Sequence, residues 1–126
     1  MKITIKTKNI ELNEVIKELI DDKINGLEKF IKSYHKDDEW EKIKPSCEFS
    51  VEIEKETRHY EKGPYFRAEI QVYLPRKTLI AEARSENLQT AITEIKDEMQ
   101  SEIKKYKSKV IDKNRKIQRN FLNKLV

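Results

Sequence analysis

The sequence predicts an α+β fold: a two-layer sandwich with the element order β-α-β-β-β-α, followed by a basic C-terminal extension. Apolar residues alternate with polar ones in four short segments, as in strands with one buried face, and recur every three to four residues in two longer segments, as in amphipathic helices. One four-stranded sheet with both helices on the same face buries all of these apolar surfaces together. The β-α-β start requires a right-handed crossover, so the first two strands should be parallel and the remaining pairs antiparallel.

Alternation and spacing near the N-terminus define the first strand and the first helix. Residues 2–7 alternate, with Ile3 and Ile5 on the buried side of a short strand. Asn13 is a candidate N-cap. The apolar residues after it recur at helical spacing, which predicts a helix of about 20 residues that ends near Tyr34.

Three more strands are predicted after a charged connection at 35–45, which Trp40 and Ile43 are expected to pin to the domain. Each strand alternates apolar and polar residues, and polar turns separate the strands at 56–64 and 75–77. The residues predicted to point inward are Cys47, Phe49, Val51, Ile53, Phe66, Ala68, Ile70, Val72, Leu74, Leu79, Ala81 and Ala83.

The second helix is predicted after residues 85–87, whose Ser, Glu and Asn offer N-cap chemistry. Its apolar stripe begins at Leu88 and fades near Val110. We therefore predict a domain at 1–110 and a basic tail at 111–126. The tail repeats apolar residues at steps of four and can form a weak amphipathic helix, at least on a partner. These residues are Ile117, Phe121 and Leu125.

Composition limits the size of the core and the class of the protein. The 126 residues suffice for one domain and a tail, and with 37% apolar and 40% charged residues the core should be thin. No apolar run approaches the roughly 18–20 residues of a membrane span, and the N-terminus lacks the apolar stretch of a secretory signal. The lone Cys47 is expected to be a small buried hydrophobe. We therefore expect a cytoplasmic protein without a membrane partner.

Charge is distributed unevenly along the chain. Residues 104–126 carry nine basic residues and one acidic residue, a net charge of +8, whereas residues 1–103 carry 18 basic and 22 acidic residues, a net charge of −4. A basic end of this kind favours a polyanion, most often nucleic acid. Its mixture of arginine and aromatic residues suits an RNA groove, and an anionic membrane surface is an alternative. The candidate binding residues in this segment are Lys104, Lys105, Lys107, Lys109, Arg115 and Arg119.

Residues suited to catalysis are few. His35 and His59 are the only histidines, and both fall in charged segments where a solvated side chain is expected. Gly26 and Gly63 are the only glycines, so the sequence contains no glycine-rich phosphate loop. The glutamates of the second predicted strand fit its solvent face better than a catalytic pair, which needs a pocket. We predict that the protein is not an enzyme and uses no cofactor, metal or small-molecule substrate.

An ordered set of short segments between about residue 1 and residue 110 carries a family resemblance. The segments are Ile3-Thr4-Ile5, Asn9-Ile10-Glu11-Leu12, Asp22-Lys23-Ile24-Asn25-Gly26-Leu27-Glu28-Lys29-Phe30, Ala81-Glu82-Ala83, Glu86-Asn87-Leu88, Ala91-Ile92 and Ile103-Lys104-Lys105-Tyr106-Lys107-Ser108-Lys109. In order and size the chain resembles the short form of the ribosome hibernation-promoting factor family. That family includes ribosome-associated inhibitor A, or ribosomal subunit interface protein, and the sigma-54 modulation protein.

The resemblance implies a fold like the double-stranded RNA-binding domain and a function without catalysis. Family members lodge between the head and the body of the small ribosomal subunit, where they block the mRNA and tRNA sites and hold the ribosome idle under stress. Basic positions on both helices contact 16S rRNA, and Lys23, Lys29 and Lys105 match such positions. The implied partner is therefore the 30S subunit with its 16S rRNA, and we expect a monomer away from the ribosome.

The chain departs from the family pattern mainly at cationic positions. Gly26, Glu98 and Ser101 stand where relatives often carry Lys or Arg, and Thr93 replaces an Asp. The chain is also too short for the separate C-terminal dimerisation domain of the long family form. We therefore expect the basic tail to supply cations that the body has lost.

A second hypothesis assigns the protein to a different class, a protein-interaction module. Its polar sheet face would dock a basic partner, with the tail as a secondary anchor. Charge reversal on that face would separate the two hypotheses. If the protein binds rRNA through its basic residues, reversing these charges should cause little loss of ribosome binding. The residues concerned are Glu48, Glu52, Glu54 and Glu69.

Overall fold

The computed structural model of the chain describes residues 2–35, 37–56 and 65–125, with side chains described up to Lys107 apart from that of Asp37. The elements in chain order are β1 (Lys2–Lys8), α1 (Glu14–Ser33), α2 (Asp37–Ile43), the 3-10 turn η1 (Lys44–Ser46), β2 (Glu48–Glu56), β3 (Tyr65–Leu74), β4 (Lys77–Ser85) and α3 (Leu88–Leu125). The α+β class and the predicted order of strands and long helices are confirmed, and α2 and η1 are additions to it.

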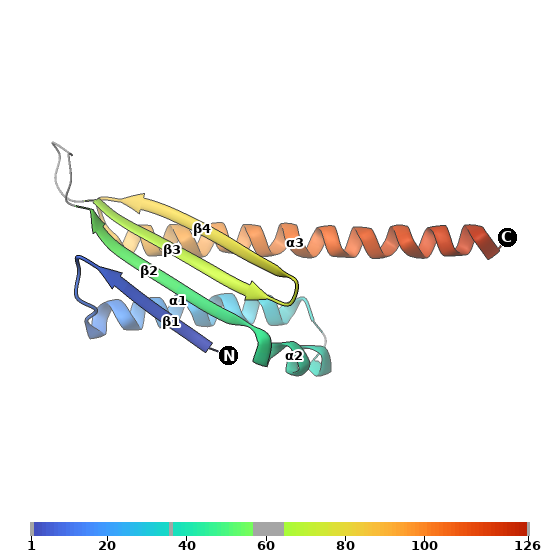
Figure 1. Cartoon of the computed structure of the whole chain (residues 1–126), viewed down its shortest axis with the longest axis horizontal. Coiled ribbons are helices and arrows are strands. Elements are labelled where there is room, and N and C mark those ends of the chain that lie inside the picture. The colour runs from blue at the N-terminus through green and yellow to red at the C-terminus, as the bar shows by residue number, and fades with distance from the viewer. Residues whose placement is uncertain (1, 36, 57–64, 126) are drawn as a thin grey trace.

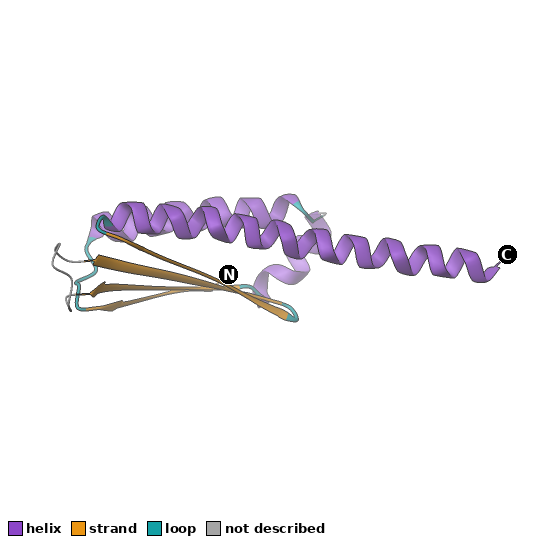
Figure 2. Ribbon diagram, turned by 90° about the horizontal axis from the view of Figure 1, so that it is seen from above, coloured by secondary structure: helices purple, strands orange, loops and turns teal. Residues whose placement is uncertain are grey.

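One mixed sheet forms the first layer and the two long helices form the second. The strand order is β1-β2-β3-β4, with β1 parallel to β2 and the other pairs antiparallel, as predicted. Both α1 and α3 cover the same face of the sheet and run in the same direction (Figure 1). The C-terminal part of α3 extends well beyond the sheet (Figure 2).

The core lies between the sheet and the long helices. The predicted inward residues of the three later strands are buried or, at Leu74 and Ala83, packed partly buried against the core, and Phe66 is half-buried. Cys47 is buried as predicted, and this burial raises the pKa of its thiol. On the edge strand β1, by contrast, Ile3 remains 39% exposed. The buried residues of the long helices are Ile20, Ile24, Leu27, Ile31, Ala91, Ile92, Ile95, Met99 and Ile103.

Both long helices begin at their predicted caps. The side-chain oxygen of Asn13 accepts a hydrogen bond from the backbone N–H of Ile16 at 2.8 Å, and α1 ends at Ser33 with Tyr34 as its C-cap. Asn87 accepts from the backbone N–H of Thr90 at 3.2 Å in the same way. Caps of this type contribute about 1 kcal/mol each. They also determine where each helix starts and therefore where its charged side chains lie.

The segment predicted as a charged connection contains the helix α2. Trp40 is 2% exposed and Ile43 packs partly buried against the core, which confirms that they pin the segment to the domain. Residues three apart lie on one side of a helix. A single helical turn therefore buries both side chains, and this favours helix over loop.

Helix α3 is longer than the predicted second helix. It runs for 38 residues from Leu88 to Leu125 without a break near Val110. The backbone of the predicted tail is thus helical as far as Leu125, whereas the division into a domain at 1–110 and a tail at 111–126 stays a prediction. In the described part of the chain, no helix is apolar over a length that would cross a membrane.

Candidate RNA-binding surface

Acidic and basic residues separate along both long helices. Four of the five acids of α1 fall in its first half, and Lys29 and Lys32 lie near its C-terminal end, whereas in α3 the acids precede Ile103 and only Asp112 follows it. Because α1 and α3 run in the same direction, their basic halves lie at the same end of the helical layer (Figure 1). The dipole of α1 favours a cation in its last turn, where Lys32 lies. We call this region the basic end, and its described lysines are Lys29, Lys32, Lys44, Lys104 and Lys105.

Lys29 lies beside a shallow hollow of about 290 Å³ between α1 and the α2–η1 segment. The side chains that line the hollow are Asn25, Glu28, Lys29, Lys32, Trp40, Glu41 and Lys44. Among the described residues, none of the three lysines takes part in an ion pair. Their ammonium groups are therefore available to an anionic ligand such as a phosphate group of RNA.

Lys23 lies farther from the basic end, at the seam between α1 and α3. It is half-buried, and together with the half-buried Lys96 of α3 it lines a small apolar void above the sheet. The aliphatic stems of the two lysines thus cover apolar surface, as long cationic side chains often do. The other residues around the void are Ile20, Ile24, Leu27, Val51, Ile70, Ile92 and Ile95.

Lys104 and Lys105 are exposed on α3. The Nζ atom of Lys105 lies 3.6 Å from Oε1 of Glu102, an exposed pair one turn apart. Pairs of this kind contribute only about 0.2–1 kcal/mol, so Lys105 can exchange this partner for a phosphate. At about 1.5 Å of rise per residue, Arg119 stands about 21 Å farther along the helix than Lys105. Lys109, Arg115 and Arg119 occupy the part of α3 where only the backbone is described.

Lys107 differs from its neighbours because it is half-buried. Its Nζ atom contacts Nε2 of His35, and burial lowers its pKa, an effect that the nearby carboxylate of Glu39 opposes. The contact joins α3 to the chain just after α1. The structure therefore shows a packing contact for Lys107, and its predicted part in RNA binding stays a prediction.

The prediction of a solvated His35 is wrong. Its side chain is 5% exposed, its Nδ1 atom lies 2.9 Å from the carbonyl oxygen of Ile31, and its ring centroid lies 6.3 Å from that of Trp40. A carbonyl oxygen only accepts, so Nδ1 carries the hydrogen and Nε2 accepts from Lys107. The burial of Trp40 explains the error, because it folds the charged segment back over His35. His59 lies outside the described residues.

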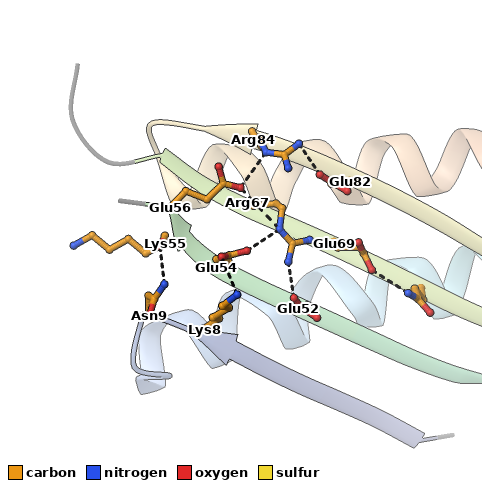
Figure 3. A network of polar contacts seen from close by, with 11 residues as sticks. Lys8, Asn9, Glu52, Glu54, Lys55, Glu56, Arg67, Glu69, Glu82 and Arg84 are labelled. Atoms are coloured by element: carbon orange, nitrogen blue, oxygen red, sulfur yellow. Dashed lines mark hydrogen bonds and ion pairs between the residues drawn. The ribbon is translucent and has the colours of Figure 1, made fainter. Parts of the chain in front are cut away.

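The outer face of the sheet, away from the helices, carries a network of ion pairs centred on Arg67 (Figure 3). The Arg67 side chain is 12% exposed and donates to Glu52 at 2.5 Å and to Glu54 at 3.1 Å. It also donates to Glu69 at 3.3 Å. The hydrogen bond from Arg67 holds the pKa of Glu54 below its usual value. Three of the four glutamates proposed to dock a basic partner therefore already have a cation of this chain as their partner.

Further pairs extend the network to the neighbouring strands. Arg84 on β4 lies 3.0 Å from Glu56 and 2.7 Å from Glu82, and on β1 Lys8 lies 3.6 Å from Glu54. The hydrogen bond to Glu56 is the main reason that the pKa of Arg84 is raised. All four strands thus contribute charged side chains that neutralise one another.

The fold brings to the helical side three lysines that the sequence pattern did not indicate as binding residues. Lys32 and Lys44 line the hollow beside Lys29, and Lys96 lies beside Lys23. Lys96 was not recognised as a binding residue because acids surround it in the sequence. In the helix, however, it lies on the side of the apolar stripe that faces α1. Counting charges by helical face rather than by segment is the signal that would have found it.

Comparison with known proteins finds matches over most of the chain. The profile of the family described as sigma 54 modulation protein / S30EA ribosomal protein matches residues 3–111. The ribosome hibernation promotion factor of Lactococcus lactis subsp. cremoris is 28% identical over 117 residues, which are 91% of this chain and 54% of that protein. The chain thus spans about half the length of this curated relative.

Two solved structures share the fold. A ribosomal subunit interface protein from Coxiella burnetii has a TM-score of 0.61 at 14% identity, over 86% of this chain and 99% of the other. The N-terminal domain of Thermus thermophilus Protein Y has a TM-score of 0.57 at 20% identity, over 84% and 99%. The profile covers most of the sequence and the resemblance predicted above is confirmed: the chain belongs to the sigma 54 modulation protein / S30EA ribosomal protein family, a family of ribosome hibernation factors.

Proposed function

We propose that the protein binds 16S rRNA in the decoding region of the small ribosomal subunit in the cytoplasm, and that it sterically blocks the binding of mRNA and tRNA. The observation that carries the proposal is the basic end, where two parallel helices present exposed lysines such as Lys29 and Lys104, which have no ion-pair partner among the described residues. Membership of a ribosome hibernation family supports the same partner. The protein would then act by occupancy, without catalysis.

The shape of the basic surface favours recognition of the RNA backbone rather than of individual bases. The cations are spread over two helices, and α3 alone is about 57 Å long at 1.5 Å of rise per residue. Phosphate contacts fix position and orientation but carry no sequence information. A structured RNA such as rRNA presents many phosphates in a fixed arrangement, so shape can supply the specificity.

The tail would add contacts that the body lacks. Lys109, Arg115 and Arg119 continue the basic end along one uninterrupted helix, which holds them at fixed spacing along α3. Each phosphate contact changes the slope of log K against log[salt] by about 0.7–0.9. Replacing all three by Gln in the full chain should therefore lower the slope by about 2–3. An unchanged slope would contradict a role for the tail.

The steric proposal is tested by cosedimentation of the full chain with purified 30S subunits, with and without tRNA. We expect saturable, salt-sensitive binding that tRNA reduces. Simultaneous binding of tRNA and protein at full occupancy would contradict the blocking mechanism, and absence of 30S binding would contradict the whole proposal.

The interaction-module hypothesis remains the alternative, and the same assay tests it. Glu52, Glu54 and Glu69 are bound by Arg67, which argues against a second basic partner at these carboxylates. Glu48 is exposed and stands outside this network. Glu48→Lys should leave 30S binding unchanged if the helical side binds the ribosome, and should abolish docking if the sheet face does.

A further inference from the structure

Gly26 on α1 lies directly beneath the side chain of Lys96 on α3. A Cβ atom at Gly26 would lie 3.5 Å from Cε and 4.0 Å from Nζ of Lys96, and no other described group outside its own helix turn lies within 4 Å. Lys96 therefore crosses the seam between the helices and covers the position where a side chain of α1 would otherwise stand. A contact of 3.5 Å is ordinary, so packing alone does not require glycine here.

Lys23 brings a second cation to the same place. It precedes Gly26 by three residues, which puts both on one side of α1, and its stem lines the same apolar void as the stem of Lys96. The void has only apolar walls apart from these two stems, so neither ammonium group has a polar partner beneath it. In the part of the chain that the structure describes, neither lysine forms an ion pair, although Asp97 and Glu98 follow Lys96 directly.

We propose that Lys23 and Lys96 form a two-lysine phosphate site across the α1–α3 seam, with Gly26 leaving the space through which Lys96 reaches α1. The ligand is a backbone phosphate of RNA, so the site deepens the rRNA-binding function proposed above and rests on it. Two ammonium groups from different helices bracket one phosphate from two sides. The two stems rest on the same apolar side chains, so both lysines are anchored at one seam before RNA binds.

The test compares the salt dependence of 30S binding for full-length variants. Lys96→Met keeps an unbranched stem over Gly26 and removes only the charge, so the slope of log K against log[salt] should fall by about 0.7–0.9. Between 50 and 200 mM salt, the affinity of the wild type should therefore fall about threefold more than that of the variant. Lys96→Arg should keep the wild-type slope. The matched control is Lys17→Met, which removes one exposed charge from the first half of α1 and should leave the slope unchanged.

A second variant tests the geometry rather than the charge. Lys96→Ala combined with Gly26→Lys moves the cation from α3 to α1 at the same place, and it should restore the slope that Lys96→Ala alone loses. Circular dichroism and thermal unfolding verify that each variant is folded.

The possible outcomes separate this site from the general function. If the wild type binds 30S subunits and Lys96→Met keeps the wild-type slope, the two-lysine site is wrong while the proposed function stands. An equal loss for Lys17→Met and Lys96→Met would also overturn the site, since only net charge would then matter. Failure of the wild type to bind at any salt concentration would overturn both.

Discussion

The two faces of the sandwich use their charges in opposite ways. On the outer face of the sheet, Arg67 and Arg84 hold the neighbouring glutamates in a network of short contacts (Figure 3). On the helical side, Lys29 and Lys104 are exposed and have no ion-pair partner among the described residues. Charges that already neutralise one another contribute to the folded state, whereas cations without partners are free for a ligand. Net charge cannot reveal this difference, because it counts both kinds alike.

The largest expected effect concerns the exposed lysines of the basic end. Replacing Lys29, Lys104 and Lys105 together by Gln should weaken 30S binding about a hundredfold near 150 mM salt, because each lost phosphate contact removes about 0.9 from the salt slope. Filter binding or cosedimentation at several salt concentrations measures this loss.

A triple variant on the sheet side provides the control for that loss. Lys2, Lys6 and Lys77 are exposed lysines of the sheet, and changing all three to Gln removes the same total charge. Equal losses for the two triple variants would contradict the division between the faces and leave only a general effect of charge.

The next largest effect concerns the paired charges. Arg67→Met should destabilise the fold by about 2–3 kcal/mol, because it leaves several neighbouring carboxylates without their shared, largely buried cation. Urea unfolding at pH 7 measures the change. Binding to 30S subunits should be unaffected where the variant is folded, and a marked loss of binding would mean that the sheet face contacts the ribosome.

The pH dependence of stability tests the ion pair between Arg67 and Glu54 on the sheet face. Hydrogen bonding to Arg67 lowers the pKa of Glu54 in the folded state below its ordinary value of 4.5. The stabilisation that this pair gives the folded state is therefore fully present above pH 4.5 and is lost as the pH falls through the lower folded-state pKa of Glu54. Unfolding curves between pH 7 and pH 3 should show a smaller decline for Arg67→Met than for the wild type. Parallel declines would contradict the assigned pairing.

The smallest expected effect concerns the seam of the helices. Gly26→Ala should stabilise the protein by up to about 1 kcal/mol, since glycine is unfavourable within a helix and the added Cβ would make only an ordinary contact of 3.5 Å with Lys96. Thermal unfolding measures the gain. A loss of stability would show that the helices are packed more closely at Gly26 than this distance indicates.

Periodicity predicted the architecture well, because each strand and helix has one continuous apolar face. The caps at Asn13 and Asn87 and the parallel pairing of β1 with β2 follow from local chemistry and from the handedness of crossovers. The polar contacts were not predictable in this way. They join residues far apart in the chain, such as Lys107 with His35 and Arg84 with Glu56, and depend on side-chain directions that spacing does not supply.

The network around Arg67 also bears on how the strands find their alignment. A slip of two residues between β2 and β3 would keep every apolar side chain facing the helices, so the core alone discriminates weakly against it. Residues 57–64 separate the two strands, too many for a tight two-residue turn to impose the alignment. In the native alignment Arg67 stands opposite Glu54, with Glu52 opposite Glu69 in the next row. A slip of two residues would place Arg67 opposite Glu52 or Glu56, at the edge of this row of glutamates rather than at its centre, so the solvent-facing side of the sandwich adds a preference for the native register.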